Sequence, residues 1–382
     1  MIRGYRIKIF PKEEQKKMIH KSFGCTRFIY NWCIDRISNH YNETKKTLSS
    51  IELQKEIVIL KKQIEYSWLN EVSANMLKQV TIDCSNAYKR WFKLIKQNNN
   101  IKGKPKYKSH KSKQNCPTRT DRMTFNGRYV HLEKIGVVKL SKVKIDLDEK
   151  LMNARLSFDG IDYWLSFSVE YKDVQLEEKP KTEPIGIDLG LKTLVYCSNG
   201  NTYEKPRTKM IDKKIKHLQR RISKIYQPMI DYCKETRTKF STLKKSNNLI
   251  KLEKELRKYQ IRKTNILDSN IHRITSDLIK LNPERIVIED LNVKGMMSNH
   301  KLARSVQSSK FYEVRKQLMY KCENNNIELV VADRFYPSSK TCSSCGKIKD
   351  DLKLKDRVYR CPQCRTIIDR DLNAAINLSR IS

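Results

Sequence analysis

Apolar residues recur with two different periods in the first hundred residues, and these periods predict the first elements. Residues 1–10 alternate apolar with basic side chains, which is typical of a strand, and Pro11 ends it. Helices are expected directly after Pro11 and over residues 50–64. The clearest helix is expected over residues 72–95, because apolar residues follow one another there at spacings of three or four. Its stripe consists of Val72, Met76, Val80, Cys84, Ala87, Trp91 and Ile95.

Strand patterns return between residues 122 and 170, separated by polar or glycine-containing turns. The expected strands are at 123–125, 137–140, 154–158 and 164–169. With the first strand, they are enough to close a small β-barrel. Residues 11–115 would then be a helical insertion in this barrel.

A charged, proline-flanked linker at 177–184 predicts a domain boundary, and a second set of elements follows it. The pattern predicts two strands joined by a glycine turn, then long helices with an Asn-rich break, and then strand, helix, strand and a final helix. This order suits a mixed α/β sheet. The expected ranges are 185–197 for the strand pair and 207–282 for the long helices, with the break near 246–248. A strand is expected at 285–289, a helix at 308–324 and a strand at 327–332.

The charge balance narrows the class of partner. The 382 residues contain 79 Lys and Arg against 42 Asp and Glu, a formal net charge of +37. Residues 88–113 contain ten Lys or Arg and no acid, and residues 205–263 contain twenty against five. So concentrated an excess predicts a phosphate-rich partner and salt-dependent binding. The alternative for the whole chain is an enzyme that is basic without binding nucleic acid. In that case residues 88–113 would be a solvated loop and residues 205–263 a solvated helical hairpin.

Cysteine usage and hydropathy indicate a reducing cytosol. No apolar run approaches the roughly 18 residues that a membrane span needs, and the N-terminus lacks the apolar core of a signal peptide. Cysteines that occur singly argue against a disulfide framework. These are Cys25, Cys33, Cys84, Cys116, Cys197, Cys233 and Cys322.

The other four cysteines form two Cys-x-x-Cys pairs, Cys342 with Cys345 and Cys361 with Cys364, separated by fifteen residues. This spacing predicts a tetrahedral Cys₄ zinc site. Four thiolates leave no open coordination position, so the zinc would be structural. The alternative is a set of unpaired core cysteines. The loop between the pairs is basic enough to contact nucleic acid, through Lys347, Lys349, Lys353, Lys355, Arg357 and Arg360.

Three short carboxylate motifs carry the candidate chemistry. Residues 186–190 and 286–290 are apolar strands that end in acids, and residues 369–375 open a helix with two more. A carboxylate at the end of a buried strand carries a costly charge that a cation neutralises. Several such groups together suit Mg²⁺, and two Mg²⁺ ions can hold a phosphodiester between the attacking and leaving oxygens. The motifs therefore predict a metal-dependent nuclease.

Within each motif, local geometry separates the roles of the acids. Glu289 and Asp290 are adjacent, so strand alternation points only one of them toward the site. Asp369 is expected to be the helix N-cap. Asp371, in the first turn, is expected to face the sheet. Asp333, at the end of its strand, is the reserve candidate.

Strings along the whole chain carry a family resemblance. They lie at 5–11, 23–31, 186–192, 288–296, 333–342 and 369–377. On these strings the chain resembles the TnpB proteins, which insertion sequences of bacteria and archaea encode and which are relatives of the type V CRISPR effectors. The chain departs from the family pattern at 307–311, and at Arg365, where glycine is common. Neither departure touches an expected catalytic acid.

The resemblance implies an α+β multidomain fold. Its parts would be a RuvC-like α/β nuclease domain of RNase H fold with a zinc-ribbon insertion, and a small N-terminal β-barrel with a helical insertion. The implied ranges are 1–10 and 116–180 for the wedge-like barrel, 11–115 for the helical recognition lobe, 184–333 and 366–382 for the nuclease domain, and 334–365 for the zinc ribbon that binds target nucleic acid.

The resemblance also implies an RNA-guided DNA endonuclease. It would bind a guide RNA made from the end of its element and cut double-stranded DNA beside a short flanking motif. Asp188, Glu289 and Asp371 would be the catalytic acids and would hold two Mg²⁺, and the four cysteines would hold zinc. The alternatives are an RNA-guided repressor that does not cleave, and an unguided RuvC-like nuclease or recombination factor.

The remaining expectations concern contacts and place. A monomer in the prokaryotic cytosol or nucleoid is expected, with no membrane contact. Contacts to nucleic acid are expected on the third predicted helix and on the basic segment that follows it. The residues are Lys78, Gln79, Lys89, Arg90, Lys93, Lys102, Lys104, Lys106 and Lys108.

Overall fold

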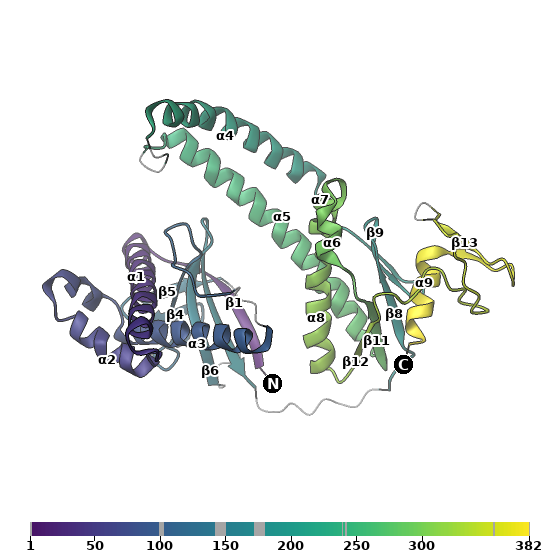
Figure 1. The fold of residues 1–382 in the computed structure, drawn as a ribbon, viewed down its shortest axis with the longest axis horizontal. Coiled ribbons are helices and arrows are strands. Elements are labelled where there is room, and N and C mark those ends of the chain that lie inside the picture. The colour runs from purple at the N-terminus through teal and green to yellow at the C-terminus, as the bar shows by residue number, and fades with distance from the viewer. Residues whose placement is uncertain are drawn as a thin grey trace. The chain divides into compact units, whose positions relative to one another are not determined.

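The computed structural model divides the chain into two compact units, Met1–Val174 and Gln175–Ser382. Each unit is described by itself (Figure 1). The residues described are 2–98, 103–141, 150–171, 180–238, 240, 243–353 and 356–381. Residues 177–179 of the predicted linker therefore lie outside them.

A seven-stranded sheet forms the centre of the first unit, in the order β2-β6-β7-β1-β5-β4-β3. All its pairings are antiparallel. Within the described residues the edge strands β2 and β3 do not pair with each other, so the closed barrel stays a prediction. The strands are β1 Ile2–Phe10, β2 Gln114–Pro117, β3 Thr124–Asn126, β4 Tyr129–Leu132, β5 Gly136–Leu140, β6 Lys150–Phe158 and β7 Tyr163–Glu170.

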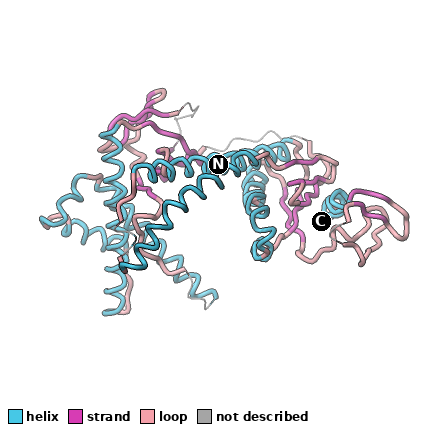
Figure 2. Tube along the Cα trace, turned by 90° about the horizontal axis from the view of Figure 1, so that it is seen from above, coloured by secondary structure: helices cyan, strands magenta, loops and turns pink. Residues whose placement is uncertain are grey.

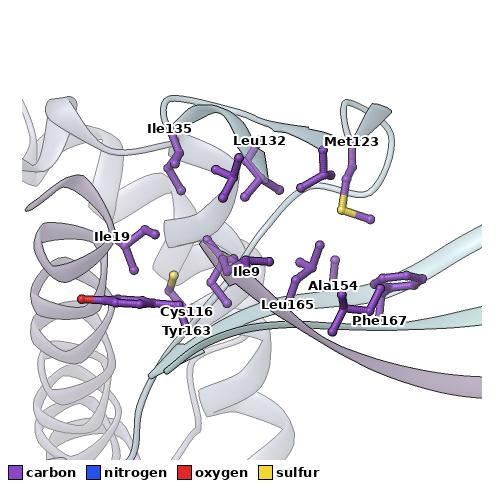
Figure 3. Close-up of a cluster of buried hydrophobic side chains, with 14 of the residues drawn as sticks. Ile9, Ile19, Cys116, Met123, Leu132, Ile135, Ala154, Tyr163, Leu165 and Phe167 are labelled. Carbon is purple, nitrogen blue, oxygen red and sulfur yellow. The ribbon is translucent and has the colours of Figure 1, made fainter. Parts of the chain in front are cut away.

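One face of this sheet is buried under helix α1, Glu13–Thr44. Leu165 and Phe167 alternate with more exposed residues along β7, as the period of a strand requires. Both side chains pack in one cluster with Ile9 of β1, Cys116 of β2 and Ile19 of α1 (Figure 3). Cys116 and Leu165 are fully buried. The short strand β2 is therefore held by its contribution to the core.

The helices of the first unit build a second core, beside the sheet. They are α1, α2 Ser50–Leu60, a 3₁₀ helix Ile64–Glu71, and α3 Ala74–Asn98. The predicted stripe is confirmed, because Val80 and Cys84 of α3 are buried against α1. The helix expected over 50–64 ends earlier, at Leu60. At its start, Ser49 and Glu52 form a reciprocal capping box.

The second unit contains a five-stranded mixed sheet in the order β10-β9-β8-β11-β12, which confirms the predicted mixed α/β class. The strands β8, β11 and β12 are parallel, and β9 and β10 run antiparallel to their neighbours. The strands are β8 Ile185–Leu189, β9 Thr193–Cys197, β10 Thr202–Glu204, β11 Arg285–Glu289 and β12 Glu328–Ala332.

Helices cover both faces of this sheet (Figure 1). Ile187 and Ile288 pack on α5 and α8, and Val287, which points the other way, packs on Leu378 of α9. The helices are α4 Lys209–Thr236, α5 Asn247–Lys280, α6 Val293–Ser298, α7 His300–Ser309, α8 Phe311–Asn324 and α9 Arg370–Ser379. None of the helices that the structure describes is long and apolar enough to cross a membrane.

Two predicted helix boundaries in this unit are wrong. The break between the long helices ends at Ser246, whose side chain caps α5, so residues 247 and 248 of the break predicted near 246–248 already belong to the first turn of α5. The helix expected over 308–324 is two helices. Lys310, between α7 and α8, adopts the left-handed conformation with φ 50°, which interrupts the helix.

A small module follows β12 and precedes α9. Its strands are β13 Val358–Arg360 and β14 Ile367–Asp369, which pair antiparallel. Figure 2 shows that the rest of this region, beside the C-terminal helix, is mostly loop. So little regular structure indicates that something other than a hydrophobic core holds the module together.

Candidate active site and zinc site

The parallel strands β8 and β11 bring two acids together at their carboxyl ends. Ile187 pairs with Ile288, so the next residues, Asp188 and Glu289, are neighbours across the two strands. Since side chains alternate along a strand, both carboxylates lie on the face opposite the buried Ile187 and Ile288. That is the face on which α9 packs. The carboxyl edge of parallel strands is also where α/β sheets place their ligands.

Helix α9 brings the third acid to the same edge. Asp369 caps the helix by accepting hydrogen bonds from the backbone N–H groups of Asp371 and Leu372, as predicted. The helix lies directly on β8: a Cβ atom added to Gly186 would be 2.0 Å from the carbonyl oxygen of Ala375. This contact, possible only with glycine at position 186, directs the first turn of α9 and Asp371 toward Asp188.

The three carboxylates interact electrostatically. Burial raises the pKa of Asp188 well above its ordinary value, and Glu289 and Asp371 raise it further. Burial also raises the pKa of Glu289. A hydrogen bond from the Ser338 hydroxyl opposes this rise, and Asp371 adds to it. The sequence therefore places three acids where their negative charges repel, which is typical of a functional site.

The acids differ in how their charges are compensated. Asp371 accepts a hydrogen bond of 3.1 Å from Arg370 and forms an ion pair of 3.6 Å with Arg357. Asp188 accepts no hydrogen bond from any residue that the structure describes, although Arg370 lowers its pKa slightly from a distance. A half-buried carboxylate without a bonded partner, beside two more, fits a hard divalent cation with oxygen ligands.

Two other acids near this edge have local partners. Asp290 forms ion pairs with Arg315, at 2.9 Å, and with Arg334. Two arginines therefore compensate the charge of Asp290, whereas Glu289 is bonded to Ser338. Asp333 is exposed, and it accepts a hydrogen bond of 2.8 Å from the backbone N–H of Phe335. Asp333 thus fixes a turn after β12.

The four predicted zinc ligands lie together. Their sulfur atoms are all within 4.8 Å of one another, the one group of three or more such ligands found in the described parts of the chain. The Sγ atoms of Cys342 and Cys364 are 3.6 Å apart, and those of Cys345 and Cys361 are 3.5 Å apart. Tetrahedral zinc with Zn–S bonds of about 2.3 Å separates its sulfurs by about 3.8 Å, so this set fits the metal.

Local structure prepares the zinc site. Hydrogen bonds from the side chain and backbone of Thr366 lower the pKa of Cys364 to about 6, which favours the thiolate that binds metal. Gly346 and Arg365 follow the two Cys-x-x-Cys pairs with φ of 76° and 60°. Arg365 therefore adopts a left-handed conformation that glycine adopts more readily, which explains why arginine is unusual after the second Cys-x-x-Cys pair.

Replacing Cys361 by serine is expected to reduce zinc from about one ion per chain to nearly none, because three thiolates cannot complete the site. Apparent zinc-binding free energies of about 10–16 kcal/mol in small zinc domains make the metal a main source of their stability. Metal analysis of the purified chain measures the content. Cys233→Ser, at a half-buried cysteine of α4 outside the cluster, is the control. Full zinc retention in Cys361→Ser would contradict the assignment.

Five of the nine residues predicted to contact nucleic acid line two cavities of the first unit. Lys78 and Gln79 of α3 line a polar cavity of about 430 Å³ with Arg119 and Thr120. Lys89, Arg90 and Lys108 line another of about 590 Å³. Arg155 lines both cavities.

Three of the other predicted contacts, Lys93, Lys104 and Lys106, do not line these cavities. Lys93 and Lys106 are exposed, and the Nζ of Lys104 lies 5.9 Å from the centre of the Trp91 ring. Lys102 lies outside the described residues. Lys108 is partly desolvated: its Nζ is 3.5 Å from the centre of the Tyr30 ring, and burial lowers its pKa.

Sequence reasoning missed Ser338, which donates a hydrogen bond of 2.7 Å to Oε1 of Glu289. It also missed the role of the buried Asn373 and Asn377 of α9, whose side chains bind the backbone of the loop that carries Ser338. Ser338 lies in the string at 333–342, but a single serine in an irregular loop has no period that reveals its partner. The asparagines could have been noticed as polar residues on the apolar face of a helix.

Three family models match the chain. The IS605 OrfB model described as "Helix-turn-helix domain" matches residues 1–46, the one described as "Probable transposase" matches 166–300, and "Cas12f1-like, TNB domain" matches 311–378. In the structure the first segment contains β1 and the single long helix α1. The third match contains the four cysteines.

Relatives match along almost the whole chain. A protein of Streptomyces pristinaespiralis named "Putative RNA-guided DNA endonuclease" is 28% identical over 98% of this chain and 88% of its own length. The Escherichia coli protein "Putative RNA-guided DNA endonuclease InsQ" is 23% identical over 99% and 91%. The mimivirus "TnpB-like protein L770" is 25% identical over 100% and 73%.

Among solved structures, the Cas12f1-sgRNA-target DNA complex matches with 14% identity and a TM-score of 0.36, over 100% of this chain and 99% of the other. At so low a score this likeness adds nothing to the assignment. The transposase matches and the zinc-ribbon match define a transposon-encoded protein with a Cys₄ module. Together, these matches along almost the whole chain support a protein of the TnpB family.

Proposed function

We propose that this protein is an RNA-guided DNA endonuclease encoded by an insertion sequence. The observation that carries the proposal is the meeting of Asp188, Glu289 and Asp371, from three separate segments, at one edge of a sheet. It agrees with the names of the relatives that match over nearly the whole chain. The substrate is double-stranded DNA beside a short flanking motif, and the reaction is hydrolysis of a phosphodiester.

Asp188, Glu289 and Asp371 hold the catalytic metal in this proposal. Two Mg²⁺ ions, when bound, supply the charge that activates water and stabilises the leaving 3′ oxygen. The chain's own residues fix the oxygen ligands. Strands β8 and β11 set the spacing of Asp188 and Glu289, the Ser338 hydroxyl orients Glu289, and the position of α9 on Gly186 sets Asp371. Arg370 and Arg357 limit the net negative charge.

The division of labour between segments is also part of the proposal. The RuvC-like nuclease domain of RNase H fold comprises 184–333 and 366–382, with the zinc ribbon at 334–365. The wedge-like barrel comprises 1–10 and 116–180, with the recognition lobe at 11–115. In support, β8, β9 and β10 form an antiparallel meander beside the parallel strands β11 and β12, and the acids end two neighbouring parallel strands.

The two cavities of the first unit suit different contacts to nucleic acid. The cavity of Lys78 and Gln79 is lined by more neutral polar residues than charged ones. Neutral hydrogen-bond donors and acceptors suit recognition of base edges in the flanking motif. In the other, Lys89, Arg90 and Arg155 surround one acid, Asp83, which suits contact with phosphates. Pairing of the guide RNA with target DNA would supply most of the sequence specificity, as in other RNA-guided effectors.

Expression with the native flanking DNA of the element is expected to yield one abundant co-purifying RNA, with a constant scaffold and a variable 3′ end. The RNA-loaded protein is then expected to cut a plasmid that carries the matching target, in Mg²⁺ and not in EDTA. Sequencing of the RNA and of the cut ends measures both results.

Three controls separate the proposal from its alternatives. A target with a scrambled guide match should stay intact. Guided binding without cutting would favour a repressor. Cleavage that persists after removal of the RNA would favour an unguided nuclease. If the co-purifying RNA consists of heterogeneous host fragments and no guided cutting occurs, the positive charge of the protein explains only non-specific binding of nucleic acid.

A further inference from the structure

The Glu289 carboxylate is bonded to a residue that no motif singled out. Ser338 donates its hydroxyl to Oε1 of Glu289 at 2.7 Å. Among the residues that the structure describes, it is the hydrogen-bond partner of this carboxylate. Ser338 is 5% exposed, so water does not compete freely for the bond. We propose that Ser338 is a positioning residue that fixes the catalytic orientation of Glu289 and depends on the zinc module for its own place.

Helix α9 holds the backbone of Ser338. The side-chain amide of Asn377 donates to the carbonyl oxygens of Ser338 and Thr341, both at 2.7 Å. Asn377 is 2% exposed, and a buried amide is costly unless it is bonded, so the position of the loop and that of the asparagine depend on each other. The backbone N–H of Ser338 also donates to the carbonyl of Tyr336, at 2.8 Å. Ser338 is therefore fixed on both sides of its Cα atom.

The same helix holds the first zinc-binding turn. Asn373, which is fully buried, donates to the carbonyl of Thr341 at 2.7 Å and accepts from the backbone N–H of Ser343 at 2.9 Å. Cys342 lies between these two anchored residues. One helix thus binds Ser338 and the first zinc turn, and carries Asp371 in its own first turn. Zinc, when bound to Cys342, would fix the loop from one end, and β12 fixes it from the other.

This arrangement has a consequence for the metal ligands. A glutamate has three side-chain torsions, and without a partner its carboxylate samples several rotamers. The Ser338 bond engages Oε1 and restricts these rotamers, while the second oxygen accepts no hydrogen bond from the residues that the structure describes. Residues that orient a metal ligand typically change metal affinity or activity by about 10–100-fold when they are replaced. The inference rests on the proposed function, because it assigns Glu289 to the catalytic metal.

The test compares Ser338→Ala with Ser338→Thr, which retains a hydroxyl. Ser309→Ala is the matched control, because Ser309 is equally buried in the same unit and bonds only within its own region, to the carbonyl of Ser305. For each RNA-loaded protein, target binding, the cleavage rate and its half-saturating Mg²⁺ concentration are measured. A second measurement follows Mn²⁺ binding to the full chain without RNA by electron paramagnetic resonance, with Asp188→Asn as the background.

For Ser338→Ala, we expect cleavage or metal affinity to be about 10–100-fold weaker, with target binding and zinc content unchanged. We expect Ser338→Thr to recover most of the loss and Ser309→Ala to show none. Wild-type cleavage and Mn²⁺ affinity in Ser338→Ala would overturn the inference. A loss in Ser338→Ala together with lost zinc or a lowered melting temperature would also overturn it, since the serine would then be merely structural. If the unsubstituted protein neither cuts nor binds Mn²⁺ above background, the proposed function itself fails.

Discussion

Replacing Asp188 by asparagine is expected to abolish DNA cleavage and, at the same time, to stabilise the fold. Asparagine has nearly the same shape but no charge, and metal-ion catalysis contributes several kcal/mol to charge stabilisation in the transition state. Several kcal/mol correspond to a loss of about 10³-fold or more in rate. Binding of guide RNA and target should persist, because Asp188 is not among the residues that line the two basic cavities. Single-turnover cleavage and filter binding measure the two effects.

The gain in stability follows from the pKa of Asp188. Burial and two neighbouring acids raise this pKa, so the folded state holds its proton more tightly than the unfolded chain. A carboxyl group with a raised pKa in the folded state destabilises the fold once the pH rises above the ordinary pKa of the group. This cost is absent at lower pH, where the group is protonated in both the folded and the unfolded state. In EDTA at pH 7, Asp188→Asn should therefore melt at a higher temperature than the unsubstituted protein. The difference should vanish as the pH falls toward about 4.

Asp333→Asn is the matched control. Asp333 directly follows the parallel strand β12, but it is exposed and bonds to its own turn, so its replacement should leave cleavage unchanged. Cleavage that survives in Asp188→Asn would remove Asp188 from the site. A lowered melting temperature without cleavage would instead indicate a structural role.

The parts of the fold that the sequence could predict are those with a strong local period. The stripe of α3 and the apolar runs of β8 and β11 were readable, because each side chain's burial follows directly from its position in the element. Strands β2 and β4 have four residues each; β2 pairs with the distant β6, and β4 pairs with its neighbours β3 and β5. So short a strand is stabilised mainly by its neighbours, and its own residues carry little signal.

Interruptions of helices were harder to predict. The sequence predicts a single helix over residues 308–324, but residues 308 and 309 belong to α7 and α8 begins at Phe311. The left-handed Lys310 that separates them is a residue without a turn preference. Its side chain forms an ion pair with Asp268 of α5, a contact between distant segments. Tertiary contact therefore accompanies a break that no local rule indicates.

For the candidate site, the motifs identified the acids but not their partners. Asp188, Glu289 and Asp371 stand at the ends of regular elements, where strand direction and helix capping make their places predictable. The partners Ser338 and Arg357 lie in irregular segments, 49 residues after Glu289 and 14 before Asp371 (338 − 289 and 371 − 357). Nothing in a one-dimensional pattern pairs such positions. The pairing arises from the packing of α9 on the sheet.

Replacing Gly186 by alanine adds one methyl group. Among glycine-to-alanine substitutions in the second unit, we expect this one to lower the free energy of unfolding most. The added Cβ would lie 2.0 Å from the carbonyl oxygen of Ala375 and 2.4 Å from the backbone nitrogen of Ser379. Both atoms belong to the backbone of α9, so no side-chain rotation relieves the overlap. Overpacking typically costs about 1–3 kcal/mol, and a clash with a helix backbone should be at the upper end or above. In a unit of this size, that lowers the melting temperature by about 10 °C.

The same substitution should also impair catalysis, because α9 can relieve the clash only by moving away from β8, and Asp371 moves with it. We therefore expect reduced cleavage even below the melting transition, with target binding retained. Gly4→Ala is the control: Gly4 also lies within a strand, β1, but its added Cβ would meet no atom within 4 Å. Calorimetry and cleavage assays at 20 °C separate the two effects. Equal melting temperatures for the two variants would mean that α9 does not lie directly on β8, which would remove the physical basis for placing Asp371 beside Asp188.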